Sequence, residues 1–163
     1  MIGTERTRGS AARPSAQVSR FMARYDADII GVAIDARARL RRRMPGAHEL
    51  VYDNYNALVI GFGPTERASD AVLSLALYPR WVTLFFLFGA TLPDPLGLLK
   101  GSGKQVRSIR LETASIVDTP GVRALIDAAL AEADPPMPLR SRGRVIIKSV
   151  SANQRTRRPK ARR

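Results

Sequence analysis

The sequence contains no cysteine and a single histidine, His48. Without cysteine the chain has no disulfide, no thiolate metal ligand and no cysteine nucleophile. A single imidazole also excludes metal sites that depend on several histidines. No Gly-x-Ser-x-Gly motif accompanies His48, so the sequence gives no sign of a serine-hydrolase site. These absences favour a non-enzymatic protein.

Long apolar runs are also missing. The longest uncharged apolar run covers residues 81–93, which is shorter than the ~20 residues of a membrane-spanning helix. The first twenty residues hold no apolar stretch of the ~7–15 residues that a secretory signal requires. We therefore expect a cytoplasmic protein that has no membrane partner.

Acidic side chains are scarce, with 14 Asp and Glu against 27 Lys and Arg, for a net charge of +13. The excess is uneven, because residues 44–137 carry more acidic than basic side chains and residues 138–163 carry no acid at all. Blocks of like charge at a terminus usually stay disordered and act as interaction tails. We predict that this tail contacts nucleic acid or another polyanion; the alternative is a tail that only keeps the protein soluble. The predicted polyanion-binding residues are Arg155, Arg157, Arg158, Lys160, Arg162 and Arg163.

The hydrophobic pattern predicts one helix before and one helix after a series of strands in the sequence. Apolar residues spaced three and four apart predict a helix from residue 16 to Met44, just before Pro45, with a break allowed at Gly31. A second helix begins at Thr119-Pro120 and ends before Pro135. Between them lie five short runs rich in β-branched and aromatic residues, which predict strands within 49–56, 57–63, 71–79, 81–89 and 104–112.

Short links between the predicted strands favour an antiparallel meander. The sequence therefore predicts an α+β fold, a two-layer sandwich in the order helix, five-stranded antiparallel sheet, helix. Residues 144–150 are a candidate for an additional edge strand. The predicted divisions are a disordered segment at 1–15, a folded domain at 16–134, a linker at 135–152 and a disordered basic tail at 153–163.

The glycine-rich segment after Leu98 is a candidate anion site. It is not a P-loop, because Leu98 stands where the first glycine is required and Gln105 follows the lysine. Its backbone amides and basic side chains still favour an anion-binding nest, and a turn that begins a strand is the alternative. One of the two glycines should adopt a positive φ. The predicted site consists of Gly101, Ser102, Gly103, Lys104 and Arg107.

Residues 50–130 resemble the YdhG-like family, a bacterial domain of unknown function with a frataxin-like fold. The resemblance lies in the strand pair at 52–62, in Tyr78-Pro79 and in the pattern Leu-Leu-x-Gly-x-Gly-Lys-x-x-Arg at 98–107. It implies a frataxin-like arrangement and, since some relatives have been proposed as iron chaperones, iron as a candidate ligand.

Frataxin-type iron binding uses an acidic first helix, whereas residues 20–43 of this chain hold seven arginines, which repel Fe²⁺. We predict no cofactor. The alternative function is a carrier of iron or of a small anionic metabolite at the Gly101–Arg107 loop.

Two further groups of residues allow two interpretations each. Glu49 and Asp53, four apart in one predicted strand, share a face and either bind a hard cation or form surface salt bridges. The aromatic residues of the strands and turns either form a stacking surface or belong to the core. These aromatic residues are Tyr52, Tyr55, Tyr78 and Trp81.

Overall fold

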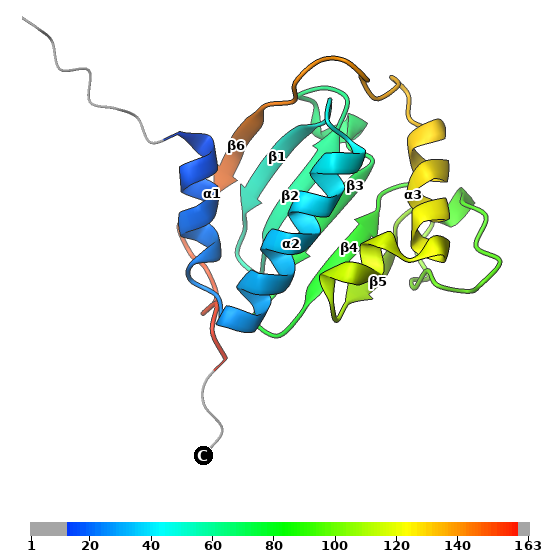
Figure 1. Cartoon of the computed structure of the whole chain (residues 1–163). Helices are drawn as coiled ribbons and strands as arrows, with labels where there is room; N and C mark the ends of the chain where they lie inside the picture. Colours follow the sequence, from blue (N-terminus) through cyan, green and yellow to red (C-terminus); the bar gives the residue numbers. More distant parts are fainter. Residues whose placement is uncertain (1–12, 160–163) are drawn as a thin grey trace, which may run out of the picture.

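The computed structural model describes residues 13–159 (Figure 1). Its helices are α1 (Pro14–Met22), α2 (Ala27–Arg43) and α3 (Pro120–Ala131). Its strands are β1 (His48–Asp53), β2 (Leu58–Gly63), β3 (Leu73–Leu77), β4 (Val82–Phe86), β5 (Arg107–Leu111) and β6 (Val145–Val150). Short 3₁₀ helices lie at Ala68–Asp70, Gly89–Thr91 and Ala114–Asp118.

The six strands form one sheet in the order β5-β4-β3-β2-β1-β6. The five predicted strands are present, and they pair as an antiparallel meander. The candidate strand at 144–150 is also present, as β6, and it pairs with β1 in parallel. The prediction of a purely antiparallel five-stranded sheet is therefore wrong, because the connection after α3 returns the chain to the starting end of β1. A parallel neighbour requires such a long crossover.

All three helices lie on one face of the sheet, and no helix covers the opposite face within the described residues (Figure 1). The strand register aligns one buried residue from each of β1 to β5 on the covered face. These five residues are Val51, Ile60, Leu75, Leu84 and Ile109. Together with the apolar side of α2 they form a single core that confirms the two-layer α+β class.

The first predicted helix is two helices, and the break lies at residues 23–26 instead of Gly31. The chain turns there because Tyr25 is fully buried in the core. Its hydroxyl donates to the Leu77 carbonyl (2.9 Å) and accepts from the Leu58 amide (3.0 Å). Burial raises the pKa of this hydroxyl above the ordinary value of 10.0, while nearby Arg157 acts in the opposite direction. Tyr25 therefore remains a neutral donor that joins β2 and β3.

The residues after β6 cross the end of the sheet and are held by a buried ion pair. Arg157 and Asp53 are only 2% and 1% exposed. Nη2 of Arg157 lies 2.9 Å from Oδ1 of Asp53, and its Nη1 donates to the Tyr55 carbonyl at 3.2 Å. The guanidinium carbon lies 5.7 Å from the centroid of the Tyr25 ring. Charge, hydrogen bonding and ring contact thus offset part of the desolvation of this arginine, whose Nε is buried without a hydrogen-bond partner among the described residues.

Backbone hydrogen bonds support the same segment. The Ser151 amide donates to the Asp53 carbonyl at 2.8 Å, and the Arg155 amide donates to the Tyr55 carbonyl at 2.9 Å. Residues 153–159, which the sequence assigns to a disordered tail, thus contact the body of the protein through a buried ion pair and through backbone hydrogen bonds. The remaining predicted tail residues lie outside the described residues: Lys160, Arg162 and Arg163.

The connection between β4 and β5 contains the glycine conformation that the sequence predicted. Gly101 has a φ of 130°, which confirms a positive φ at one of the two glycines. A Cβ atom at this position would lie 3.2 Å from the Val106 carbonyl oxygen. Gly103 has open space around its Cβ position. The backbone conformation of this loop therefore depends on Gly101.

We expect Arg157→Met to lower the free energy of unfolding by about 3–5 kcal/mol, because it leaves the Asp53 carboxylate buried without its partner. The double variant Arg157→Met with Asp53→Leu removes both charges and should recover most of that loss. Arg155→Met, at a neighbouring exposed position, is the control and should change stability by less than about 0.5 kcal/mol. Urea denaturation measures all three. A double variant no more stable than the single one would mean that the pair is not coupled.

Gly101→Ala should lower the free energy of unfolding by about 1–3 kcal/mol, since alanine is strained at this φ. Gly103→Ala, two residues away in the same loop, is the matched control and should have little effect. Thermal or urea unfolding distinguishes them, and equal effects of the two substitutions would contradict the assigned loop conformation.

Candidate functional site

In the predicted anion-binding loop, the side chain of Arg107 points back toward the loop's own backbone. Nη1 of Arg107 donates to the carbonyl oxygens of Gly103 (2.6 Å) and Val106 (2.8 Å). Lys104 and Ser102 are exposed. The five residues are adjacent on one loop, as the sequence implies, but the arginine closes that loop instead of pointing to an open space. Anion binding here stays a prediction.

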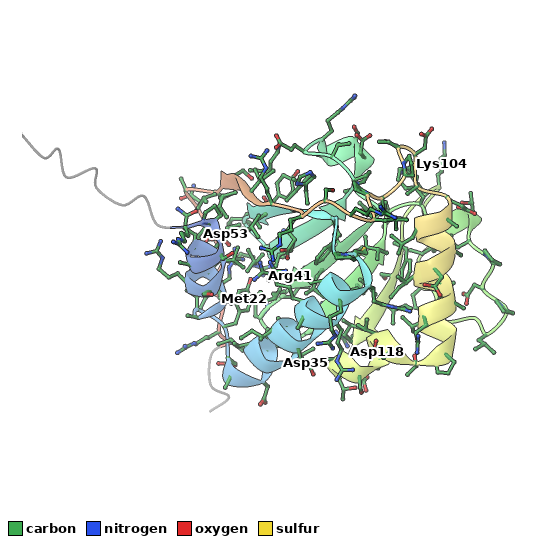
Figure 2. All side chains as sticks on the ribbon, turned by 45° about the horizontal axis from the view of Figure 1, so that its top comes forward. Met22, Asp35, Arg41, Asp53, Lys104 and Asp118 are labelled. Atoms are coloured by element: carbon green, nitrogen blue, oxygen red, sulfur yellow. The ribbon has the colours of Figure 1, made fainter. Side chains whose placement is uncertain are left out.

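The arginine-rich end of α2 is compensated by carboxylates. Glu49 is 3% exposed, and it accepts from Arg37 Nε at 2.7 Å and lies 3.1 Å from Arg41 Nε. Arg39 pairs with Asp35 and Asp118, which lie beside each other in Figure 2, and these hydrogen bonds raise the pKa of its guanidinium. Most of the arginines at this end of α2 are therefore engaged in ion pairs, and the exposed Arg42 is not, within the described part of the chain.

Glu49 and Asp53 share the helix-covered side of β1, as their spacing predicts. Each carboxylate is paired with arginines: Glu49 with Arg37 and Arg41, and Asp53 with Arg157 and, at 3.5 Å, Arg24. The salt-bridge interpretation of these two acids is confirmed, except that the carboxylates are buried and do not lie on the surface.

Three chain segments meet at one end of the sheet. β1 and β3 both run antiparallel to β2, so the turns that follow them, at residues 54–57 and 78–81, lie at the same end. β6 runs parallel to β1, and the C-terminal residues 151–159 therefore emerge at this end too. The two turns and this segment enclose a hollow that we call the turn-end groove.

The turn-end groove has a volume of about 950 Å³ and opens widely to solvent. Its lining includes three arginines and three aromatic residues but no acidic residue. The lining residues that carry this chemistry are Tyr55, Tyr78, Arg80, Trp81, Arg155 and Arg158. Three of the four aromatic residues that the sequence analysis named thus gather here. The fourth, Tyr52, lies on β1, where burial raises the pKa of its hydroxyl.

Two aromatic side chains of the groove are exposed, and one of them, Trp81, packs against neighbouring side chains. Tyr55 is 54% and Trp81 is 38% exposed. The rings of Tyr78 and Trp81 are 5.4 Å apart and tilted by 31°. The guanidinium carbon of Arg110, on β5, lies 4.5 Å from the centre of the Trp81 ring. Tyr78, Trp81 and Arg110 thus form a packed cluster at the turn end of the sheet.

Four exposed arginines at this end have no carboxylate partner in the described part of the chain. Within residues 13–159, none of the four lies within ion-pair distance of a carboxylate, whereas four of the five arginines of α2 do, Arg42 being the exception. Arg155 and Arg158 instead donate to neutral oxygens, those of the Asn56 side chain (3.3 Å) and the Tyr25 backbone (3.3 Å). None of these four guanidinium groups is therefore neutralised by a direct ion pair among the described residues, although Asp28 and Glu112 line a neighbouring hollow together with Arg80 and Arg110. The four are Arg80, Arg110, Arg155 and Arg158.

Two of these arginines were not among the predicted site residues. Arg80 stands directly beside Trp81 in a Pro-Arg-Trp turn, a local signal that could have identified it. Arg110 meets the same tryptophan only through the register of β4 with β5, in which its neighbour is Thr83. No sequence spacing reveals that contact. Of the predicted tail residues, Arg155 and Arg158 line the groove, whereas Arg157 is buried.

Two kinds of feature are absent from residues 13–159. No group of three or more histidine or acidic side chains gathers there in a way that could hold a metal ion. Over the same residues, no helix combines the length and the hydrophobicity needed to cross a membrane.

Comparisons with protein-family models, with curated proteins and with solved structures found no match to this chain. The resemblance to the YdhG-like family and the frataxin-like fold that it implies therefore stay predictions.

Proposed function

We propose that this chain is a non-enzymatic nucleic-acid-binding protein whose contact surface is the turn-end groove. The observation that carries the proposal is the group of four exposed arginines without carboxylate partners around an acid-free groove. The planar guanidinium of arginine donates two parallel hydrogen bonds to a phosphate. Such contacts hold a nucleic-acid backbone in place without reading its sequence.

A polymer fits these arginines better than a small anion does. Sites for small ligands enclose them and use a few convergent polar groups. Here the arginines are exposed and come from three different segments, the β3–β4 turn, β5 and the C-terminal residues. Each exposed contact is weak alone, but contacts to successive phosphates act together through release of bound counterions.

The proposal differs in one physical respect from binding by a flexible tail. Arg155 and Arg158 flank Arg157, whose ion pair with Asp53 fixes the segment against β1. The fold therefore sets where the two exposed guanidinium groups lie before any ligand binds. Ordering them costs less entropy than ordering a disordered chain would.

The carrier function of the Gly101–Arg107 loop has no comparable observation in its favour. Figure 2 places Lys104 and Asp53 on opposite sides of the molecule. The loop and the turn-end groove can therefore be tested separately by substitution.

We expect the triple variant Arg80→Ala, Arg155→Ala, Arg158→Ala to weaken binding of a labelled DNA duplex and to flatten its salt dependence. Each phosphate contact adds about 0.9 to the slope of log affinity against log salt concentration, so the slope should fall by about 2 to 3. Fluorescence anisotropy at three salt concentrations measures this change.

The matched control is Arg42→Ala, Arg67→Ala, Arg123→Ala, which removes the same charge at exposed positions outside the groove. It should leave the slope nearly unchanged. Urea denaturation confirms that both variants are folded. Equal losses in the two triple variants would show that only net charge matters, and failure of the wild type to bind at low salt would refute the proposed function.

A further inference from the structure

The proposed function explains the arginines of the turn-end groove but not its aromatic residues. Tyr55, Tyr78 and Trp81 do not belong to the hydrophobic core cluster. Tyr55 and Trp81 instead expose 54% and 38% of their surface on two tight turns. Partly exposed aromatic rings that gather around one groove are typical of a binding surface.

Resting on the proposed function, we infer that the groove takes single-stranded nucleic acid, with unpaired bases stacked on Tyr55, Tyr78 and Trp81. Grooves that bind single strands combine basic side chains along the backbone with aromatic rings under the bases. Basic side chains and aromatic rings both line the turn-end groove, whose lining, within residues 13–159, has no acidic residue. In a duplex each base face is covered by its neighbours, so these rings can reach only an unpaired base.

Contacts within the protein position Trp81 before any base binds. The Tyr78 amide donates to the Trp81 carbonyl at 2.9 Å, which closes the β3–β4 turn around Pro79 and Arg80. The Arg110 guanidinium and the Tyr78 ring brace the indole. A ring that is fixed before binding loses little conformational entropy when a base stacks on it.

Each exposed ring lies on a turn that also holds or contacts an arginine. Arg80 immediately precedes Trp81 in the chain, and the Arg155 side chain contacts Asn56, next to Tyr55. Each exposed ring on the two turns therefore has an arginine without a carboxylate partner beside it.

Trp81 is the only tryptophan of the chain, so the intrinsic fluorescence of the protein reports directly on the groove. Three probes separate the contributions: a thymidine oligomer, an abasic oligomer with the same number of phosphates, and a duplex of the same length. The thymidine oligomer should quench Trp81 emission and bind about 5- to 150-fold more tightly than the abasic one, as expected for one stacked base. The abasic oligomer and the duplex should bind without quenching.

Two substitutions test the rings themselves. Trp81→Leu and Tyr55→Leu should each lower the affinity for the thymidine oligomer at least fivefold, measured by anisotropy, and leave the affinity for the abasic oligomer within twofold. Phe88→Leu is the matched control, because Phe88 is 47% exposed but lies outside the groove. It should change neither affinity.

The outcomes distinguish the two proposals. Equal affinity for the thymidine and abasic oligomers, with no quenching, would overturn base stacking while leaving phosphate binding intact. Tighter binding of the duplex than of the single strand would overturn it as well. If neither oligomer binds at low salt, the proposed function itself fails.

Discussion

The buried ion pair between Arg157 and Asp53 holds the segment after β6, residues 151–159, against the end of the sheet. Asp53 ends β1, and its carboxylate lies between Arg157 of the C-terminal segment and Arg24 of the turn after α1. A carboxylate that is nearly inaccessible to water is tolerated only with such partners. The pair therefore ties α1, β1 and the C-terminal residues together, and the wall of the turn-end groove formed by residues 151–159 depends on it.

The same residue type serves opposite purposes at two ends of the fold. At the end of α2, arginines neutralise Glu49 and other acids, and they stabilise the packing of that helix on the sheet. At the turn end, four arginines meet no carboxylate within the described residues and surround exposed aromatic rings. Net charge alone does not separate these two cases. The distribution of carboxylates does, which is why the proposed ligand contact lies at the turns.

Local signals predicted much of the fold. Alternating β-branched residues placed all five meander strands, and Thr119-Pro120 placed the start of α3. The sequence allowed a helix break at Gly31, whereas the break lies at residues 23–26. Its position depends on the burial of Tyr25 between β2 and β3, which is a tertiary constraint. The burial of Arg157 was missed because composition treats every arginine of a basic block alike. Of the candidate site, the sequence indicated the aromatic residues, whereas Arg110 reaches Trp81 only through strand register.

The central claim is that Arg157 and Asp53 fix the C-terminal segment as a rigid wall of the groove. Amide hydrogen exchange at Ser151 and Arg155 tests it most directly, because both amides donate to β1 or its following turn. We expect both to exchange slowly in the wild type. In Arg157→Met we expect exchange there to become fast, while the amides of β2 to β4 stay protected. An Arg155 amide that exchanges as fast in the wild type as in an unstructured peptide would contradict the claim.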